Sequence, residues 1–154
     1  MIAVIQRVKK TSLAANGSPY SEIGNGFLVL LGVLSGDDGT DAKLLADKIV
    51  KLRVFSDENG KMNRSLADVG GEVMVVSNFT LAANYRHGNR PDFLRAAPPS
   101  EADRLYGSFV KLVEGAGVPT KTGVFGADMQ IQTTADGPVT IVMDSTVLRK
   151  EPKS

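Results

Sequence analysis

The segment from Ser77 to Leu81 combines two hydroxyl groups and an amide where a run of apolar residues ends. Val73 to Val76 precede it and have the composition of a buried strand, so these polar side chains are expected where the chain leaves the sheet. Hydroxyl and amide groups at such a place could bind a substrate or position a reacting group. They could equally cap unpaired backbone groups at the strand end.

A second segment, Tyr85 to Pro91, holds two arginines, a histidine and an aromatic ring, with no acidic residue before Asp92. A basic loop of this composition suits contact with phosphates and stacking on bases, and a solvated loop has the same composition. His87 is the only histidine of the chain, and no neighbouring carboxylate is positioned by sequence to orient it. It is therefore interpreted as a surface residue and not as a catalytic base.

A third segment, Ala135 to Thr140, contains Gly137-Pro138 between two predicted strands. Proline has no N–H to donate to a strand ladder, and Gly-Pro is a frequent turn sequence. The residues themselves predict a turn. Asp57 to Gly60 resembles part of a calcium loop, but the later ligands are missing, and its length predicts a hairpin turn.

The composition excludes several kinds of chemistry. The chain has 154 residues, no cysteine and one histidine, which excludes disulfides, thiolate metal sites, cysteine nucleophiles and zinc centres with several histidines. Its net charge of +1 neither favours nor opposes a polyanionic partner, so any such partner must meet a local basic patch. The longest apolar run, Phe27 to Leu34, is too short to span a bilayer, and the N-terminal residues lack the order of a secretory signal. These features predict a cytoplasmic protein with no membrane contact.

The elements that must position these segments follow from periodicity and turn signals. Asn16-Gly17 predicts a type I′ hairpin turn. Thr40 is expected to cap one amphipathic helix with Asp41 as an acid in its first turn, and Ser100 and Asp103 have the spacing of a capping box for a second. Strands are expected over 1–10, 20–23, 27–34, 54–55, 73–76, 120–124, 129–133 and 139–143. This order predicts an α+β fold with largely antiparallel, curved, barrel-like sheets and two main helices on one side, in a single domain over 1–148 with a polar tail over 149–154.

Six segments, in this order and spacing, resemble the D-aminoacyl-tRNA deacylase family. They cover nearly the whole chain, and together they are specific where each alone is weak. One position departs from the family, which usually has glutamine where this chain has Asn78. The segments are Ala3 to Val8, Leu31 to Val33, Ser77 to Leu81, Gly88 to Pro91, Phe125 to Gln130 and Gly137 to Thr140.

The resemblance implies a homodimeric hydrolase that cleaves the ester between a D-amino acid and the 3′-terminal adenosine of tRNA, without metal or cofactor. It places catalysis at Ser77, Asn78, Phe79 and Thr80. Backbone N–H groups near Phe79 and Thr80 would stabilise the oxyanion, the Thr80 hydroxyl would position the substrate, and the ribose 2′-hydroxyl would assist attack.

The resemblance also implies that Gly137-Pro138 is cis and enters the active site of the other subunit, where its carbonyl oxygens exclude an L side chain. Glycine has no side chain to exclude, so glycyl-tRNA mischarged on tRNA-Ala is a further expected substrate. The tRNA contacts would come from Arg86, His87 and Arg90. Two alternatives stay open: a catalytically inactive RNA-binding module, and a relative that edits L-misacylated tRNA with a trans Gly-Pro.

Overall fold

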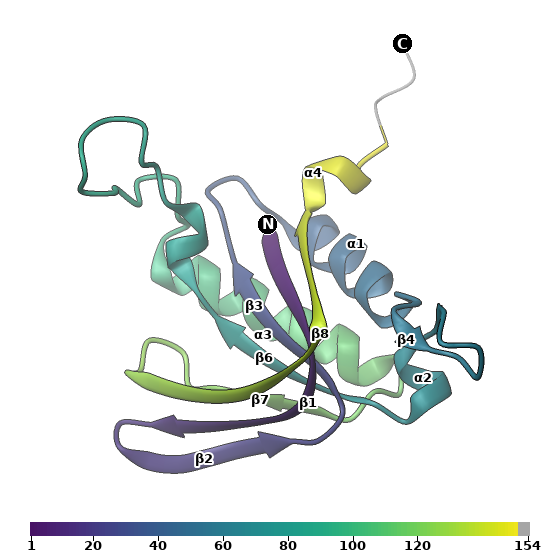
Figure 1. Ribbon diagram of the computed structural model, residues 1–154. Coiled ribbons are helices and arrows are strands. Elements are labelled where there is room, and N and C mark those ends of the chain that lie inside the picture. The colour runs from purple at the N-terminus through teal and green to yellow at the C-terminus, as the bar shows by residue number, and fades with distance from the viewer. Residues whose placement is uncertain (151–154) are drawn as a thin grey trace.

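The computed structural model describes residues 1–150 and contains one main sheet, one small hairpin and helices on one side of the sheet (Figure 1). In chain order the elements are β1 (Ile2–Ala15), β2 (Ser18–Ile23), β3 (Gly26–Gly32), α1 (Gly39–Val50), β4 (Phe55–Ser56), β5 (Met62–Arg64), α2 (Leu66–Val69), β6 (Glu72–Ser77), the 3-10 helix η1 (Phe79–Ala82), α3 (Pro99–Gly115), β7 (Thr120–Thr122), β8 (Met129–Asp144) and α4 (Ser145–Leu148).

The main sheet has the strand order β2-β1-β3-β6-β7, and β8 pairs with β1 beside this path. β1 is antiparallel to β2, β3 and β8, whereas β3, β6 and β7 are parallel to one another because α1 and α3 lie in the connections between them. The long strands β1 and β8 bend together, and the sheet curls into a nearly closed barrel (Figure 1). The predicted α+β class and barrel-like sheet are confirmed.

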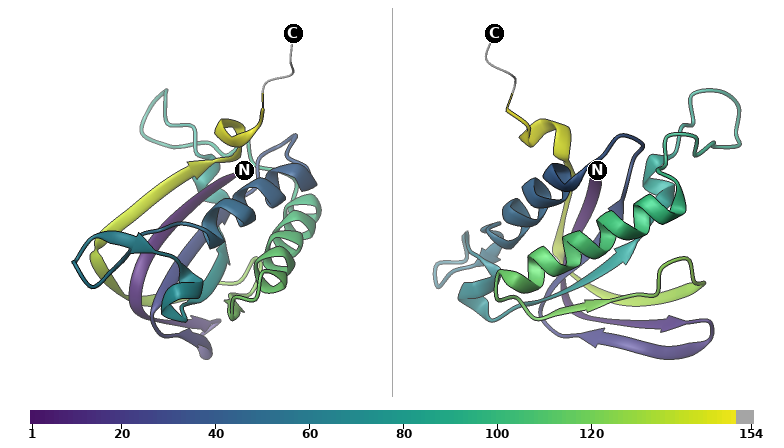
Figure 2. Two further views of the ribbon diagram at one scale, coloured as in Figure 1. Left: turned by 90° about the vertical axis from the view of Figure 1, so that its right-hand side faces the viewer. Right: turned by 180° about the vertical axis from the view of Figure 1, so that it is seen from behind.

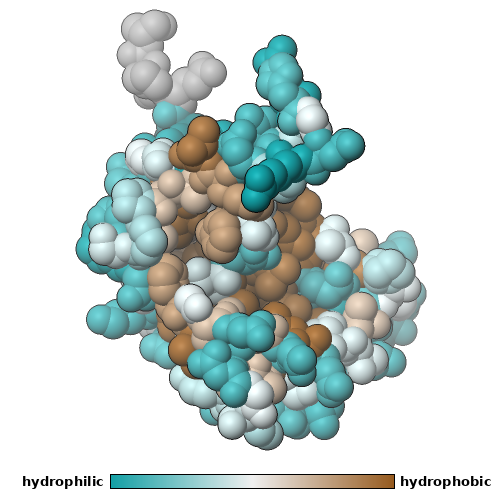
Figure 3. Space-filling view, turned by 90° about the vertical axis from the view of Figure 1, so that its left-hand side faces the viewer, coloured by the Kyte–Doolittle hydropathy of each residue, from teal (hydrophilic) through white to brown (hydrophobic). Residues whose placement is uncertain are grey.

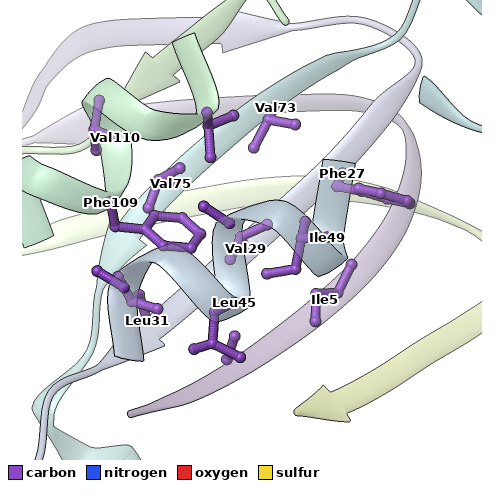
Figure 4. Close-up of a cluster of buried hydrophobic side chains, with 14 of the residues drawn as sticks. Ile5, Phe27, Val29, Leu31, Leu45, Ile49, Val73, Val75, Phe109 and Val110 are labelled. Atoms are coloured by element: carbon purple, nitrogen blue, oxygen red, sulfur yellow. The ribbon is translucent and has the colours of Figure 1, made fainter. Parts of the chain in front are cut away.

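The main core lies between the sheet and the two long helices. Figure 2 shows α1 and α3 side by side on one face of the sheet. Figure 4 shows side chains of both helices, among them Leu45 and Phe109, packed against sheet residues such as Val29 and Val75, and all four are buried. Burial of this apolar area is the main stabilising contribution to the fold.

A second apolar cluster lies on the other face of the sheet and includes Val8, Leu13, Leu28, Met74 and Val76. Figure 3 views the molecule from the left-hand side of Figure 1 and shows an apolar hollow bordered by hydrophilic side chains. An apolar area that remains open on a protein surface favours contact with another molecule.

Both helix starts differ from the prediction. The N-cap of α1 is Asp38, whose side chain accepts from the N–H groups of Thr40 and Asp41, so the cap lies two residues before Thr40. The capping box predicted for Ser100 and Asp103 is wrong. α3 begins at Pro99 without a side-chain cap, because proline is favoured at the first helical position and places Ser100 inside the helix.

The prediction of two C-terminal strands joined by a turn is also wrong. Residues 129–144 form one strand, β8, and Gly137-Pro138 lies in its middle. Among residues 1–150, β8 pairs only with β1 and is an edge strand, where a proline without an N–H is tolerated at a bulge. The turn predicted at Asn16-Gly17 is confirmed, since both residues have positive φ angles of 50° and 82°.

Arg149, the first residue of the predicted polar tail, is bound to α1. Its Nη2 lies 2.8 Å from Asp38 Oδ1 and 2.7 Å from Asp41 Oδ2. Although burial raises the pKa of Asp41, hydrogen bonds from Arg149, the Asp38 backbone and Ser145 bring that pKa well below its usual range. The rest of the predicted tail includes residues 151–154, which lie outside the described residues. Within residues 1–150 no helix has the length and apolar character needed to cross a membrane.

Candidate active site

The strand β6 ends at Ser77 and leads directly into η1. Ser77 pairs with Leu31 of the parallel strand β3, and the Asn78 N–H donates to the Leu31 carbonyl at 2.8 Å. The turn packs closely on Gly32, where a Cβ atom would lie 2.9 Å from Leu81 Cβ and 3.1 Å from the Asn78 carbonyl oxygen. Glycine at position 32 therefore allows η1 to rest on the end of β3.

Asn78 is the N-cap of η1. Its Oδ1 accepts the Thr80 N–H at 3.2 Å and also accepts the Thr80 hydroxyl. Asparagine is among the side chains that cap helices in this way, and the longer glutamine is not. The residue that departs from the family therefore has a local role in fixing the turn.

The Asn78 cap binds only one of the two backbone N–H groups that were predicted to stabilise the oxyanion. The Thr80 N–H already has an acceptor, whereas the Phe79 N–H has none among residues 1–150. The Thr80 hydroxyl donates to a neutral amide oxygen, which is no base, so nothing here activates it as a nucleophile. The arrangement can stabilise a developing negative charge through the Phe79 N–H and can position a substrate.

The ring of Phe79 is 59% exposed and forms an edge-to-face pair with Phe93 at 5.2 Å between ring centroids. Sequence reasoning missed Phe93. The available signal was an aromatic residue immediately after the basic loop, at a place where a base could stack. The two rings give the turn an apolar border.

Asn84 and Asp92 flank the basic loop and close it by hydrogen bonds, and the residues between Tyr85 and Pro91 are exposed. Asn84 and Asp92 exchange both backbone hydrogen bonds, at 2.8 and 3.0 Å, and their side chains are bonded at 3.1 Å. Arg86, His87 and Arg90 lie in the exposed part, and within residues 1–150 none of them forms an ion pair. These side chains are available to an external anion.

Gly137-Pro138 is a cis peptide, as the resemblance implies, and both residues are exposed. Gly137 has a φ of +122°, and a Cβ there would lie 2.9 Å from the Val139 nitrogen and 3.2 Å from Arg7 Nη2. The backbone at this position therefore requires glycine for both its conformation and its close packing.

The buried side chain of Arg7 holds the start of this segment. Its Nε donates to the Asp136 carbonyl at 3.2 Å and lies 3.3 Å from Asp136 Oδ2, and its Nη1 donates to the Val54 carbonyl at 2.6 Å. Sequence reasoning gave Arg7 no role of its own. A polar Gln6-Arg7 pair inside an apolar strand was the signal that could have found it.

A single chain does not bring Gly137-Pro138 to the turn at Ser77 to Thr80. The atoms nearest to a Cβ atom at Gly137 would belong to Val139 and Arg7. The Arg7 side chain is in turn hydrogen-bonded to the carbonyl of Val54, just before β4. In Figure 1, β6 runs away from the middle of β8 toward η1. The predicted site residues thus form separate regions of one chain.

The candidate site consists of backbone donors, a capped turn and a rigid backbone segment. Within residues 1–150 no three carboxylate or histidine side chains gather in a way that could hold a metal ion. The fold and these regions define an α+β protein whose candidate site offers backbone N–H groups and positioned polar side chains.

Comparison with known proteins identifies the family. The family model for D-Tyr-tRNA(Tyr) deacylase matches residues 4–144, and the chain belongs to this family. It is 52% identical to a D-aminoacyl-tRNA deacylase of Thermomicrobium roseum, with 97% of each chain covered. It is 53% identical to one of Pelobacter propionicus, over 94% of this chain and 99% of the relative.

Solved structures agree with the fold. A c-Myc DNA Unwinding Element Binding Protein superposes with a TM-score of 0.88 at 41% identity, over 94% of this chain and 98% of that one. A probable eukaryotic D-amino acid tRNA deacylase superposes with a TM-score of 0.80 over 92% of this chain and 97% of that one, at 17% identity, which supports the fold alone.

Proposed function

We propose that this protein hydrolyses the ester of D-aminoacyl-tRNA and releases the free D-amino acid and tRNA. The observation that carries the proposal is the family match over residues 4–144. An aminoacyl ester is already activated, so the protein needs mainly to position it and stabilise the oxyanion. The Phe79 N–H, which has no acceptor among residues 1–150, is suited to that task, and the ribose 2′-hydroxyl of the substrate assists attack.

The active site is composite, with Ser77 to Thr80 from one subunit and Gly137-Pro138 from its partner in a homodimer. Two observations support this arrangement: the two regions lie apart within one chain, and Gly137-Pro138 is exposed on an edge strand. The apolar hollow in Figure 3 supports a contact between subunits. Each site then requires the dimer.

Chirality is selected by exclusion. Better fit of a side chain in a pocket contributes about 1 to 3 kcal/mol, whereas a 10⁴-fold preference for the D-substrate needs about 5.5 kcal/mol. The backbone at Gly137-Pro138 holds the α-amino group and leaves no room for an L side chain. Glycine has no side chain to exclude, so glycyl-tRNA mischarged on tRNA-Ala is also a substrate.

Arg86, His87 and Arg90 contact phosphates near the 3′ end of the tRNA, because they are exposed and have no internal ion pair within residues 1–150. The exposed rings of Phe79 and Tyr85 are available for stacking on unpaired bases. The proposal includes a cytoplasmic location, where aminoacyl-tRNA is made and used.

The deciding experiment compares deacylation of D-Tyr-tRNA and L-Tyr-tRNA by the purified protein, with and without a chelator. Hydrolysis of the D-substrate alone, unaffected by chelator, supports the proposal. Absence of turnover on both substrates would indicate the RNA-binding module, and a preference for misacylated L-substrates would indicate the other alternative. Activity that vanished in chelator and returned with zinc would contradict the metal-free mechanism.

A further inference from the structure

The pairing between β1 and β8 shifts register at two places, and the larger interruption lies between Gln6 and Val8. Gln6 pairs with Thr140 and Val8 pairs with Ala135, so Arg7 alone faces the four residues 136–139. We call these four residues the β8 bulge. A bulge lacks some ladder hydrogen bonds, and its backbone is free to take other conformations unless side chains hold it.

Arg7 holds the first residue of the β8 bulge, and Gln6 holds its end. Gln6 Nε2 donates to the Val139 carbonyl at 3.2 Å, and Gln6 Oε1 accepts the Thr140 hydroxyl at 2.6 Å. Both contacts fall on the two residues that follow Pro138. A side-chain amide carries a donor and an acceptor side by side, so one Gln6 side chain makes both contacts at once.

The place of Gln6 gives these contacts a function. The Val139 carbonyl is one peptide unit beyond Pro138, and on the other side Arg7 fixes the Asp136 carbonyl. With both flanks fixed, the carbonyl oxygens of Gly137 and Pro138 have defined directions. Exclusion by backbone atoms depends on that direction, because a small displacement of a positioned group has a large effect on rate.

We propose that Gln6 is a positioning residue for chiral selection, which acts by holding Val139 and Thr140 behind Gly137-Pro138. The inference rests on the proposed function, in which this pair excludes the L side chain. Removal of the Gln6 amide breaks no hydrogen bond of the turn at Ser77 to Thr80, since within residues 1–150 the Gln6 side chain is hydrogen-bonded only to its neighbour Arg7, Val139 and Thr140. It therefore lowers selectivity more than it lowers hydrolysis of the D-substrate.

The test measures kcat/KM on D-Tyr-tRNA and L-Tyr-tRNA for Gln6→Met, Thr140→Val and the double variant. Methionine has a similar length and no amide, and valine replaces the exposed threonine without its hydroxyl. We expect the D-to-L ratio to fall about tenfold for Gln6→Met, the size of a hydrogen bond of ordinary strength. Because both variants remove one shared hydrogen bond, the effect of the double variant should be smaller than the product of the two single effects.

Thr11→Val is the matched control. Thr11 and Thr133 share a hydroxyl hydrogen bond of 3.0 Å in the same pair of strands, away from the β8 bulge. This variant should keep the wild-type ratio. If it lowered the ratio as much as Gln6→Met does, general weakening of the β1 and β8 pairing would be the cause and the inference would be overturned.

Other outcomes distinguish a failure of this inference from a failure of the proposed function. A wild-type preference for D-Tyr-tRNA with an unchanged ratio in Gln6→Met and Thr140→Val would overturn the role of Gln6 and leave the proposed function intact. A wild-type protein without any D preference would overturn both. If Gln6→Met did not fold, Thr140→Val would test the same hydrogen bond from an exposed position.

Discussion

The β8 bulge and the η1 turn are fixed in opposite ways. The turn is held locally, by Asn78 two residues before Thr80 and by the adjacent end of β3. The bulge is held by Gln6 and Arg7, which are about 130 positions away in the chain. The turn therefore forms wherever its own sequence permits, whereas the bulge depends on the assembled sheet. Under the proposed function, we expect the turn to contribute to the rate of hydrolysis and the bulge to contribute to both rate and selectivity.

The largest effect is expected from removal of the Phe79 N–H of the turn, which has no acceptor among residues 1–150. Phe79→Pro deletes that donor without breaking an internal hydrogen bond, and proline suits the first position of a helix. Asn78, with φ −144° and ψ 92°, has the extended conformation that a residue before proline favours. We expect single-turnover hydrolysis of D-Tyr-tRNA to slow by about 10² to 10³-fold.

Phe79→Ala is the control for this variant, because it removes the ring and keeps the N–H. It should retain most of the chemical rate and weaken substrate binding. Equal reductions in both variants would show that the ring matters and the backbone donor does not.

The bulge is tested next by adding one methyl group at Gly137. In Gly137→Ala the new Cβ meets the Val139 nitrogen and Arg7, at a φ that alanine rarely adopts. We expect kcat/KM on D-Tyr-tRNA to fall about a hundredfold, since a displacement near 1 Å has an effect of this size. Gly117→Ala is the matched control, with a positive φ of 84° and open space around it, and it should stay close to wild type.

The hydrogen bonds by which Arg7 supports the bulge should contribute to the free energy of unfolding. Arg7→Met leaves the Asp136 carboxylate and the Val54 carbonyl without their partner. We expect the free energy of unfolding in urea to fall by about 2 to 3 kcal/mol, as for hydrogen bonds to charged groups. The exposed Arg104 and Glu101 pair offers a comparison, and Arg104→Met should lower the free energy by less than about 1 kcal/mol. Similar decreases in the two variants would contradict a structural role for Arg7.

Beyond the contribution of the Phe79 ring, affinity for tRNA should depend mainly on the basic loop. Changing Arg86 and Arg90 to alanine should weaken tRNA binding and reduce its salt dependence by about one unit of slope for each phosphate that the variant no longer binds. The measurement is the dissociation constant at several salt concentrations. An unchanged slope would assign these arginines to a solvated loop.

The smallest effect is expected for the Thr80 side chain. Thr80→Ala removes a hydroxyl that donates to Asn78 and keeps the backbone of the turn. Activity should fall less than about tenfold, as for one hydrogen bond of ordinary strength. A decrease of about 10⁴ to 10⁶ in the rate of hydrolysis would instead identify Thr80 as a nucleophile that acts with a base.

The same difference between local and distant interactions explains what the sequence could predict. The Asn16-Gly17 turn, the two long helices and the polar strand end at Ser77 depend on neighbouring residues, and their existence is readable from pattern. The turn predicted around Pro138 was wrong because the conformation there depends on pairing with β1, which local pattern does not contain. Gln6 and Arg7 were missed for the same reason, since their partners in β8 lie about 130 positions away.

Helix boundaries were less predictable than helices. Both Asp38 and Ser100 are good capping residues. Asp38 caps α1, whereas Ser100 lies inside α3 because Pro99 occupies the first helical position. The function came from resemblance, because no spacing of residues distinguishes a site made of backbone atoms from an ordinary loop.

The central claim is that each active site combines the turn of one subunit with the β8 bulge of its partner. The most direct test mixes Phe79→Pro with Gly137→Ala under conditions in which subunits exchange, and measures hydrolysis of D-Tyr-tRNA. In a mixed dimer, one site receives an intact turn and an intact bulge, and the other site receives both defects. With half of the dimers mixed, we predict recovery to about a quarter of wild-type activity. No recovery, with mixed dimers demonstrated, would place both elements of each site in one chain and contradict the account.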